Sequence, residues 1–508
     1  MRPRIDNVDF AVDEHIWGHR LYDEQLPHLA VLEFLTVLRS NTKAPLRLLG
    51  DATPRYKPQR QLRLRALLFN NPFVETIRAR PLSEPEKWNA WMERFKKDAE
   101  GLADADFAYL REAFGDFEDF ARAVELLRSS SFEARSNKRW SSKFVFPFGP
   151  DALYEDLRVD AKGAATNDRR FFARTGELLY LMLSRAKRGP ELGDKLVERL
   201  FDASLPMNRL VRAMQGPPQT APDDRPVGYL PYDSLARFDR LCEDWLAILS
   251  RDMPVYDALE HLIAITGLNL MLYFLERGKA QAGQAEPVEI VCEMVSRERT
   301  KIRALSAESY MANQGYSAAA IRFSIESAKL SPEWSEALAS SDPKDACAAV
   351  LRSRFQWPPE DGGDDADALN KDGDQLVEQL VEKALSRHEQ HVDKIHPAWS
   401  RAIGLSSRRL SRRTRYAPND RLLKSLVVAI VESRMQFDEF LAEVKSRYGL
   451  VVGDVEGARL MNEKLVDQEA LSDNRSNFEA RLAGLGLVRR LSDSCSFVEN
   501  PFAPGGQV

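Results

Sequence analysis

The sequence predicts a mainly α-helical protein: a multi-helical body with few short strands and a C-terminal winged-helix domain. Most segments between prolines place apolar residues at helical spacing, as in 27–38, 117–127, 171–183 and 235–249. Runs typical of strands are few, and they cover 143–148, 288–295 and two short stretches near the C-terminus. Helices precede that terminal pair of strands, which is the element order expected of a winged helix.

The composition is that of an ordinary globular protein. The chain has 508 residues, 44% of them hydrophobic and 29% charged, which allows roughly two to four domains and a substantial core. The net charge of −5 provides no overall positive field, so any contact with DNA depends on local clusters. The four cysteines are far apart and form no C-x-x-C pair, which favours free thiols in a reducing compartment.

No membrane attachment is expected from the sequence. The first six residues lack the apolar run of a signal peptide. The longest apolar stretch, 262–275, contains Thr266, Gly267 and Asn269 and is too short to span a bilayer, which predicts a buried helix. We therefore expect a cytoplasmic protein.

Two changes in composition divide the chain. Residues 216–231 are rich in proline, which predicts an exposed connection, and residues 358–374 are acidic and almost free of apolar side chains, which is typical of a mobile loop. The expected parts are an N-terminal helical region (1–215), a Pro-rich linker (216–232), a middle helical region (233–357), an acidic flexible loop (358–374), a helix over 375–395 followed by an Arg-rich segment (together 375–417) and the winged helix (418–508). Because the break before 418 is polar, removal of 418–508 is expected to leave the helical body folded.

The segment 418–508 has the clearest local pattern. Asn419 and Asp420 are expected to begin a helix that continues to about Met435, and a second helix covers 437–448 and ends at Gly449. The later elements are expected to be a strand over 450–452, a helical segment near 454–461, a helix capped by Asp473 that reaches about Leu485, and two strands over 487–491 and 495–498 joined by the turn 492–494. This module usually contacts DNA or another protein.

A run of arginines precedes this module. It consists of Arg408, Arg409, Arg412, Arg413 and Arg415. If the segment is helical, Arg408/Arg412 and Arg409/Arg413 lie on one face, where like charges repel. An external anion, such as a phosphate backbone or an acidic partner surface, then explains the run. The alternative is a solvated face close to the acidic loop.

The module itself offers a second set of candidate nucleic-acid contacts. In its last helix Arg475, Asn477 and Arg481 are expected to point outward, and Arg489 and Arg490 lie in the wing. Arginine and asparagine can contact base edges, and arginines commonly reach phosphates. However, acidic residues outnumber basic ones after residue 419, so a module that docks on protein remains the alternative.

No sequence pattern predicts a metal site. Three histidines, His388, His391 and His396, lie close together in the sequence. His388-Glu389-Gln390-His391 is one residue short of H-E-x-x-H, and His388 falls on the apolar side of its helix, so it is interpreted as a packing or interface histidine. The acidic loop resembles a calcium loop, but Ala368 and Gln379 occupy both anchoring positions.

No catalytic residue or cofactor is predicted either. Glu289 and Glu293 lie on one strand-like run, but neither is followed two residues later by the lysine of a metal nuclease. Phosphate-binding loops, nucleophile elbows and dinucleotide-binding turns are missing from the sequence. Triads can assemble from distant residues, so the question of enzyme activity stays open, with a non-enzyme favoured.

Two segments mix aromatic and polar side chains. They are 15–25, with Trp17 and Tyr22, and 138–148, with Trp140. An active site, a docking surface or a stacking platform for single-stranded nucleic acid could have this composition. Ordinary aromatic core with a charged edge is the commoner explanation.

Three phrases resemble uncharacterised helical subunits of bacterial anti-phage operons, of the methylation-associated or phosphorothioation-linked type. They are HIWGHRLY at 15–22, LFNNPF at 68–73, and Phe478 with LVRRLSD at 487–493. The resemblance implies a non-catalytic subunit that works beside a translocase-type ATPase or a nuclease. It identifies no site residues.

The sequence thus favours an interaction or scaffold subunit of a multi-protein anti-phage defence complex, whose winged helix contacts DNA or a partner protein. The expected partners are other subunits of the same operon and possibly DNA. The alternative is a metal-dependent nuclease or other nucleic-acid hydrolase with an unrecognised active site. A stand-alone transcriptional regulator is less favoured, because one small module would carry a large body without a ligand-binding pattern.

Overall fold

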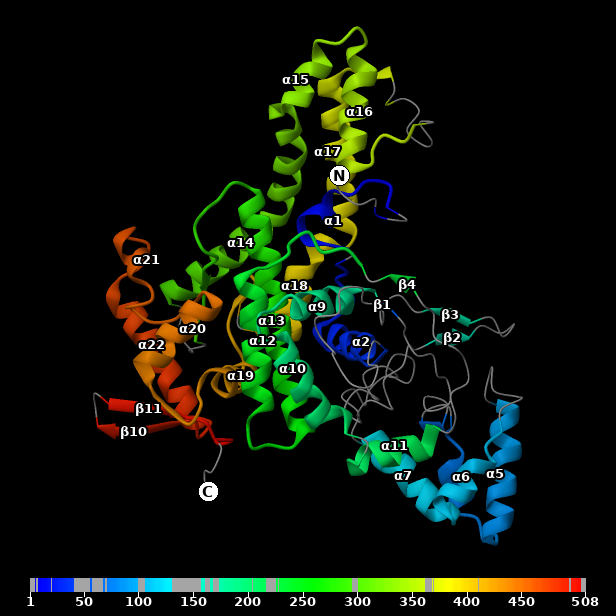
Figure 1. The fold of residues 1–508 in the computed structure, drawn as a ribbon. Coiled ribbons are helices and arrows are strands. Elements are labelled where there is room, and N and C mark those ends of the chain that lie inside the picture. Colours follow the sequence, from blue (N-terminus) through cyan, green and yellow to red (C-terminus); the bar gives the residue numbers. More distant parts are fainter. Residues whose placement is uncertain are drawn as a thin grey trace. The chain divides into compact units, whose positions relative to one another are not determined.

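The computed structural model describes most of the chain in two compact units. The described residues are 5, 8–19, 21–40, 55–56, 67–68, 71–98, 106–129, 157–159, 165–167, 173–202, 204–215, 225–226, 228–294, 300–360, 368, 370–409, 411–492 and 495–503. One unit comprises His28–Val227, and the other comprises Met1–Pro27 with Gly228–Val508. The mainly α-helical fold class is confirmed (Figure 1).

The described residues of the unit His28–Val227 form helices and two small strand pairs. Its helices are α2 (Pro27–Ser40), α4 (Val74–Arg78), α5 (Glu84–Asp98), α6 (Ala108–Phe114), α7 (Phe117–Ser129), α9 (Thr175–Ser184), α10 (Gly189–Leu196), the π-helix η3 (Val197–Phe201) and α11 (Pro206–Gln215). Its strands are β1 (Arg55–Tyr56), which pairs with β4 (Arg225–Pro226), and β2 (Leu157–Val159), which pairs with β3 (Ala165–Asn167).

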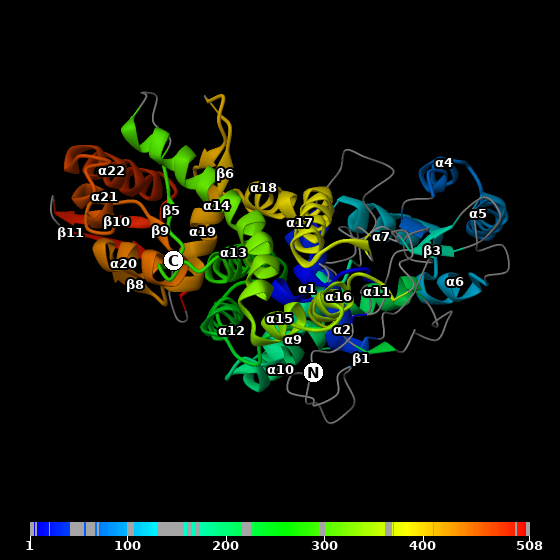
Figure 2. The same cartoon turned by 90° about the horizontal axis from the view of Figure 1, so that it is seen from above.

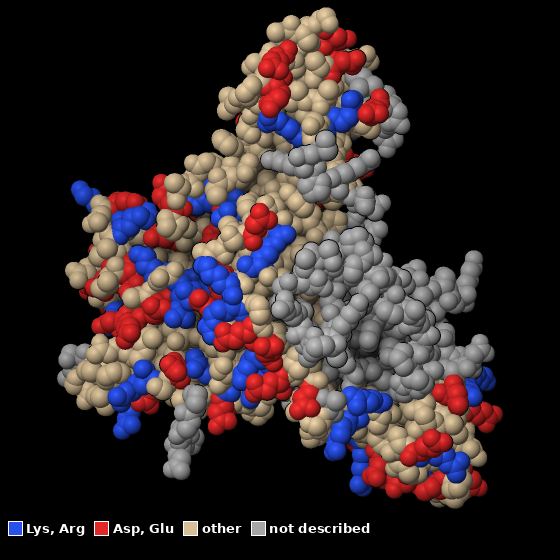
Figure 3. All heavy atoms as spheres, viewed as in Figure 1, with Lys and Arg blue, Asp and Glu red and all other residues tan. Residues whose placement is uncertain are grey.

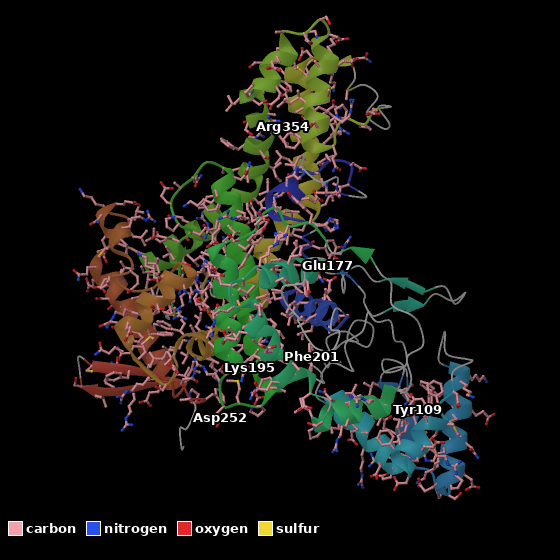
Figure 4. The ribbon with its side chains drawn as sticks, in the orientation of Figure 1. Tyr109, Glu177, Lys195, Phe201, Asp252 and Arg354 are labelled. Carbon is pink, nitrogen blue, oxygen red and sulfur yellow. The ribbon has the colours of Figure 1, made fainter. Side chains whose placement is uncertain are left out.

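An aromatic core joins α5, α6 and α7 in this unit. Trp88 and Trp91 are fully buried, and their rings lie 5.3 Å and 4.8 Å from that of Phe120. Tyr109, labelled in Figure 4, lies at the edge of this core and donates a hydrogen bond to the carbonyl of Met214 at 2.8 Å. The predicted helix over 117–127 thus forms as α7 and buries its apolar side here.

Long helices form the centre of the other unit. They include α12 (Ala236–Leu249), α13 (Val255–Gln281) and α14 (Lys301–Glu326), with α13 between α12 and α14 (Figures 1 and 2). The predicted buried stretch 262–275 lies inside α13. By length and composition Asp257–Gln281 could cross a membrane, but most of it is buried inside the protein, as in the core helix of a globular unit.

A helical arm extends from the far end of α14. It contains the end of α14, η4 (Ser327–Leu330), α15 (Pro332–Leu338), α16 (Pro343–Phe355) and the first part of α17 (Gly373–Gln390). Figure 1 shows these helices projecting away from the C-terminal elements, and Arg354, labelled in Figure 4, pairs there with Glu333 at 3.0 Å. The helix predicted over 375–395 forms as α17 but ends at Gln390. It is followed by η6 (Val392–Lys394) and by a separate helix, α18 (Ile395–Ala402).

The C-terminal elements contain a small antiparallel sheet. They are α19 (Asp420–Ile430), β8 (Arg434–Gln436), α20 (Phe437–Tyr448), β9 (Leu450–Val451), α21 (Ala458–Asn462), α22 (Gln468–Gly484), β10 (Val488–Ser492) and β11 (Cys495–Glu499). The strand order is β10-β11-β8, and Val488 faces Val498, so the predicted terminal hairpin is confirmed. The assignment as a winged helix stays a prediction.

Several boundaries in these elements differ from those predicted. Asn419 caps α19, with its side chain accepting from Leu422 N at 3.0 Å, but the helix ends at Ile430 instead of Met435, because residues 434–436 pair with β11. The last helix begins after Asp467, whose side chain accepts from Ala470 N, and not at Asp473. Helix α20 has the predicted bounds and ends at Gly449, whose φ of 69° is the left-handed conformation of a helix C-terminus.

These C-terminal elements are built into the larger unit. Strand β9 runs parallel to β5 (Ile290–Val291), which is all that the described residues form of the strand predicted over 288–295. Helix α19 packs on α12 and α13. Asn474 of α22 accepts from Met294 N and donates to the carbonyls of Cys292 and Val452. Backbone pairing and buried hydrogen bonds therefore connect the C-terminal elements to the middle region.

Candidate anion-binding hairpin

The Arg-rich segment forms a β-hairpin rather than a helix. Strand β6 (Ser406–Ser407) pairs antiparallel with β7 (Arg415–Tyr416), and the residues between them form the loop of this arginine hairpin. Figure 2 shows the hairpin projecting beyond the neighbouring helices, next to α14. The segment is thus not helical, so the i,i+4 arginine pairs that a helix would have produced do not form.

Four arginines of the loop are exposed and available to a ligand. They are Arg408, Arg409, Arg412 and Arg413. In the described part of the chain none of them forms an ion pair with a carboxylate. Exposed guanidinium groups without an internal counter-charge can donate paired hydrogen bonds to the oxygens of a phosphate or a carboxylate.

Hydrogen bonds between residues close in the sequence restrain this loop. The Ser407 hydroxyl accepts from Arg409 N at 3.1 Å, and the Ser411 hydroxyl accepts from Arg413 N at 3.1 Å. Arg408 Nε donates to the Thr414 hydroxyl at 2.7 Å. The hydroxyl residues between the arginines thus hold local turns and keep the basic side chains outside.

The fifth arginine of the run, Arg415, has a different role. It is fully buried, and its Nε donates to Glu293, which also accepts from Arg303 Nε at 2.7 Å. The prediction that Arg415 faces an external anion is therefore wrong, because a carboxylate of the protein already compensates its charge. A buried carboxylate between two guanidinium groups ties the base of the hairpin to the start of α14.

The neighbouring strand residue, Tyr416, provides a second anchor. Its carbonyl accepts from Glu293 N at 2.9 Å and from the Ser306 hydroxyl at 2.8 Å. Its buried hydroxyl accepts from Asn313 at 2.9 Å and lies 2.6 Å from His396 Nε2. Burial lowers the pKa of His396 to about 3, so this imidazole is neutral and Nε2 accepts the hydroxyl proton.

The arginines of α22 are engaged inside the protein. Arg475 pairs with Asp438 of α20, and Arg481 Nε donates to Asp420 of α19 at 2.7 Å and its NH1 to the carbonyl of Pro418 at 2.9 Å. Asn477 is exposed, but no basic side chain with a free charge accompanies it on the described part of α22. This helix therefore presents little uncompensated positive charge.

The two arginines of the terminal hairpin differ from each other. Arg490 pairs with Glu479 at 3.0 Å, whereas Arg489 is exposed and forms no ion pair with a described residue. Figure 3 shows basic and acidic groups interspersed on the visible face of the described parts. The structure therefore separates the nine candidate arginines into exposed ones without a carboxylate partner among the described residues and ones paired within the fold, and it leaves the tenth candidate, Asn477, exposed.

The histidines and glutamates considered for a metal do not come together. His391 Nδ1 lies 3.0 Å from Asp23, His388 is buried on α17, and His396 contacts Tyr416. Glu289 pairs with Arg459 at 2.5 Å. Glu293 pairs with Arg303 and Arg415. Among the described residues, no group of three potential ligands could hold a metal ion.

A cavity of about 280 Å³ lies between α12, α13 and the end of α20. Its lining includes Arg237, Lys279 and Lys445. Arg237 is bound to Glu276 and to the carbonyl of Arg447, Lys279 donates to the carbonyl of Pro287, and Lys445 donates to that of Glu456. These three cations are therefore bound by oxygens of the protein itself and support the packing of the helices.

The aromatic segment near the N-terminus is part of the core. Trp17, at the end of α1 (Val12–Trp17), stacks on Phe274 with ring centroids 4.9 Å apart, and its indole donates to the Phe274 carbonyl at 2.9 Å. Tyr273 in turn donates to the Trp17 carbonyl. The commoner explanation, ordinary core, applies to Trp17. The similar segment 138–148 lies outside the described residues.

Two residues that anchor the candidate site, the partly buried Arg303 and the buried Tyr416, were not predicted from the sequence. Arg303 binds Glu293, which also binds Arg415 over a separation of 122 residues, and Tyr416 binds Asn313 over a separation of 103 residues. No local pattern marks such pairs. The one usable signal was Glu293 itself, a carboxylate in an apolar run.

The fold and the hairpin define a class: a mainly helical protein with an exposed basic hairpin and no assembled catalytic set among its described residues. Residues 372–498 match the family model described as methylation-associated defense system protein MAD7. The match covers about a quarter of the chain, from α17 to β11, and includes the arginine hairpin. No curated protein and no solved structure gives a significant match. The resemblance to a defence-operon subunit is thus confirmed, for the methylation-associated type.

Proposed function

We propose that this protein is a non-catalytic subunit of a methylation-associated anti-phage defence complex, and that its arginine hairpin contacts the phosphate backbone of DNA. The observation that carries the DNA contact is the set of four exposed loop arginines without a carboxylate partner in the described chain. Phosphate contacts by arginine supply most of the affinity in binding that does not depend on sequence.

The position of the hairpin supports this proposal. It lies inside the segment similar to the defence-system family, and its base is held by buried partners of Arg415 and Tyr416. A basic loop on a rigid base loses little conformational freedom when it binds an anion. Arg489 is a secondary candidate, whereas Arg475, Arg481 and Arg490 are left out because carboxylates already compensate their charge.

The helices and the three-stranded sheet at the C-terminus suit a winged helix that docks on protein. Their element order, α19-β8-α20-β9-α21-α22-β10-β11, and the pairing of β8 with the terminal hairpin support the winged-helix assignment. The exposed side of α22 carries Glu469, Asp473 and Asn477. A surface of this charge repels phosphate, so we assign it to contacts with other subunits of the operon, such as a translocase-type ATPase or a nuclease. The four free thiols support a cytoplasmic location.

The DNA contact is tested by replacing Arg408, Arg409, Arg412 and Arg413 together with alanine. Fluorescence anisotropy with a labelled DNA duplex should show binding weakened at least about tenfold at low salt. Each lost phosphate contact removes about 0.9 from the slope of log K against log salt, so the slope should fall by about 3 to 4.

The matched control replaces Arg80 and Arg111, two exposed arginines of the other unit, with alanine. This variant should bind as the parent does. If the quadruple variant keeps both affinity and salt slope, the hairpin is not the DNA contact.

The absence of catalysis is tested separately by incubating the purified chain with DNA and Mg²⁺ or Mn²⁺. Cleavage that a single carboxylate substitution abolishes would replace the scaffold proposal with that of a nuclease.

A further inference from the structure

We propose that a second copy of this chain docks on the exposed side of α14, so that two α14 helices pack antiparallel around Gly315 in a homodimer. This inference concerns the assembly of the protein and does not depend on the proposed DNA contact.

The exposed side of α14 carries a row of side chains with an uncharged centre. This α14 seam consists of five exposed residues, Glu308, Met311, Gly315, Ala319 and Arg322. No residue from 309 to 321 is charged. Met311 keeps 60% of its surface exposed, and Phe323 beside the seam keeps 45%. The solvent-facing side of a helix in a globular protein usually carries charged and polar residues, so this centre indicates that a partner covers it.

The other sides of α14 are already covered within the unit. The helix packs on α13 and α17, and its Ser306 and Asn313 bind Tyr416 at the base of the arginine hairpin. Figure 2 shows the first half of α14 at the border of this unit. A homodimer through the α14 seam therefore leaves the hairpin contacts intact and joins two sets of loop arginines in one assembly.

Gly315 provides an independent observation. A glycine inside a helix lowers the stability of that helix relative to alanine. A Cβ atom at Gly315 would meet no atom of the described chain within 4 Å, so packing within one copy does not require glycine there. A glycine on an exposed helix face does allow the backbone of another helix to come close.

The spacing of the seam identifies the partner as a second copy. Met311 and Ala319 lie four residues on either side of Gly315, and Glu308 and Arg322 lie seven residues on either side of it. In an antiparallel pair centred on Gly315, Met311 of each copy faces the small Ala319 of the other copy. Glu308 of each copy likewise faces Arg322 of the other. A surface that is complementary to itself is what a two-fold homodimer requires.

Charge also determines the direction of packing. In the described chain Glu308 forms no ion pair, and Arg322 pairs with Glu326 of the same helix at 3.5 Å. Antiparallel packing adds two pairs of Glu308 with Arg322 between the copies, whereas parallel packing would place like charges side by side. One helix pair is a small interface, so we expect a dissociation constant of about 1 to 100 µM.

The experiment measures the mass of the full chain by sedimentation velocity without DNA, over concentrations from about 1 to about 200 µM. The parent should change from monomer to dimer as its concentration rises. Gly315→Lys should abolish the dimer, because the longer side chain prevents close approach of the helices. It should leave the circular dichroism spectrum unchanged, since a side chain at this position meets no neighbour within one copy.

Reversal of charge tests the antiparallel arrangement. Glu308→Arg and Arg322→Glu should each weaken the dimer at least about tenfold, because each places two pairs of like charges across the two-fold axis. An equimolar mixture of these two variants should dimerise again, since opposite charges then face each other. Glu378→Arg, the same change at an exposed position of α17, is the control and should dimerise as the parent does.

A parent that stays monomeric over the whole range overturns the proposal, as does a dimer that Gly315→Lys and the charge reversals leave intact. If the parent is monomeric and Gly315→Lys instead abolishes binding to another subunit of the operon, the seam takes a different protein and the second copy is ruled out. These outcomes leave the DNA contact untouched, because that contact is tested by the variants of the arginine hairpin.

Discussion

Arginines that are close together in the sequence have opposite environments in the structure. Arg415 is buried and shares Glu293 with Arg303, whereas Arg412 and Arg413 are exposed without a carboxylate partner in the described chain. Burial of a charge is tolerated only when an opposite charge and hydrogen bonds replace water. The partner available to each side chain therefore decides whether an arginine supports the fold or can serve a ligand.

Burial lowers the pKa of His388 and thereby makes the stability of the protein depend on pH. His388 lies on the buried side of α17, where desolvation lowers its pKa to about 4, although the charge of Glu389 opposes this shift. The folded protein therefore excludes the proton that the unfolded chain accepts near its ordinary pKa of about 6.5. Stability is lost as the pH falls from about 6.5 to about 4, because protonation favours the unfolded state.

His388→Leu should reduce this sensitivity to acid. Urea unfolding of the parent and the variant is compared at about pH 7.5 and about pH 5, and the variant should lose about 2 kcal/mol less stability on acidification. The comparison between the two pH values cancels the packing difference between histidine and leucine. An equal loss in both proteins would mean that His388 accepts a proton in the folded state.

At the scale of elements, the arginine hairpin depends on the turn that precedes it. Gly404 has φ of 79°, and its carbonyl accepts from Asn419 N at 2.8 Å. A Cβ atom at this position would overlap the side chain of Asn419, which caps α19. The absence of a side chain thus allows the end of α18, the base of the hairpin and the start of α19 to meet.

Gly404→Ala should therefore destabilise the protein. Left-handed backbone and loss of the Asn419 cap together should lower the free energy of unfolding by about 2 to 3 kcal/mol, measured by urea unfolding. Gly315→Ala is the control, because Gly315 lies inside α14 and a Cβ there would meet no atom. It should raise the stability by about 0.5 to 1 kcal/mol. Similar effects of the two substitutions would show that the Gly404 turn is not required.

For the whole molecule, the C-terminal elements belong to the same compact unit as the middle helices. Apolar residues of α19 such as Leu422, Leu426 and Val427 are buried, and this helix packs on α12 and α13. The β5–β9 pair and the hydrogen bonds of Asn474 add buried backbone contacts. Removal of these elements would expose apolar surface and unpaired backbone groups in the remaining unit.

A chain that ends at Ala417 should thus be insoluble or lose cooperative unfolding, contrary to the expectation from the polar break before residue 418. Soluble expression and circular dichroism are the measurements, and a chain that ends at Ala503 is the control. A soluble truncated protein with undiminished helical signal and the same melting temperature would show that the module folds apart from the body.

Local sequence patterns predicted the bounds of a helix accurately where a residue at its end strongly favours helix termination. Helix α20 has the predicted bounds because its apolar residues follow the helical period and Gly449 adopts a left-handed conformation. Helix α19 was predicted too long, since the strand at Arg434–Gln436 exists only because β11 pairs with it. Of the candidate site, the exposed arginines could be predicted as a cluster, but their hairpin conformation could not.

The sequence by itself determined the mainly helical class, the terminal hairpin, the arginine run and the resemblance to a defence-system family. These features depend on periodicity, turn residues and local composition, which neighbouring residues specify. Only the tertiary structure decided which arginines are free, because Asp420, Asp438, Glu293 and Glu479 reach their partners through folding. A charge is available to a ligand only when no opposite charge of the fold lies beside it, and that depends on three-dimensional neighbours.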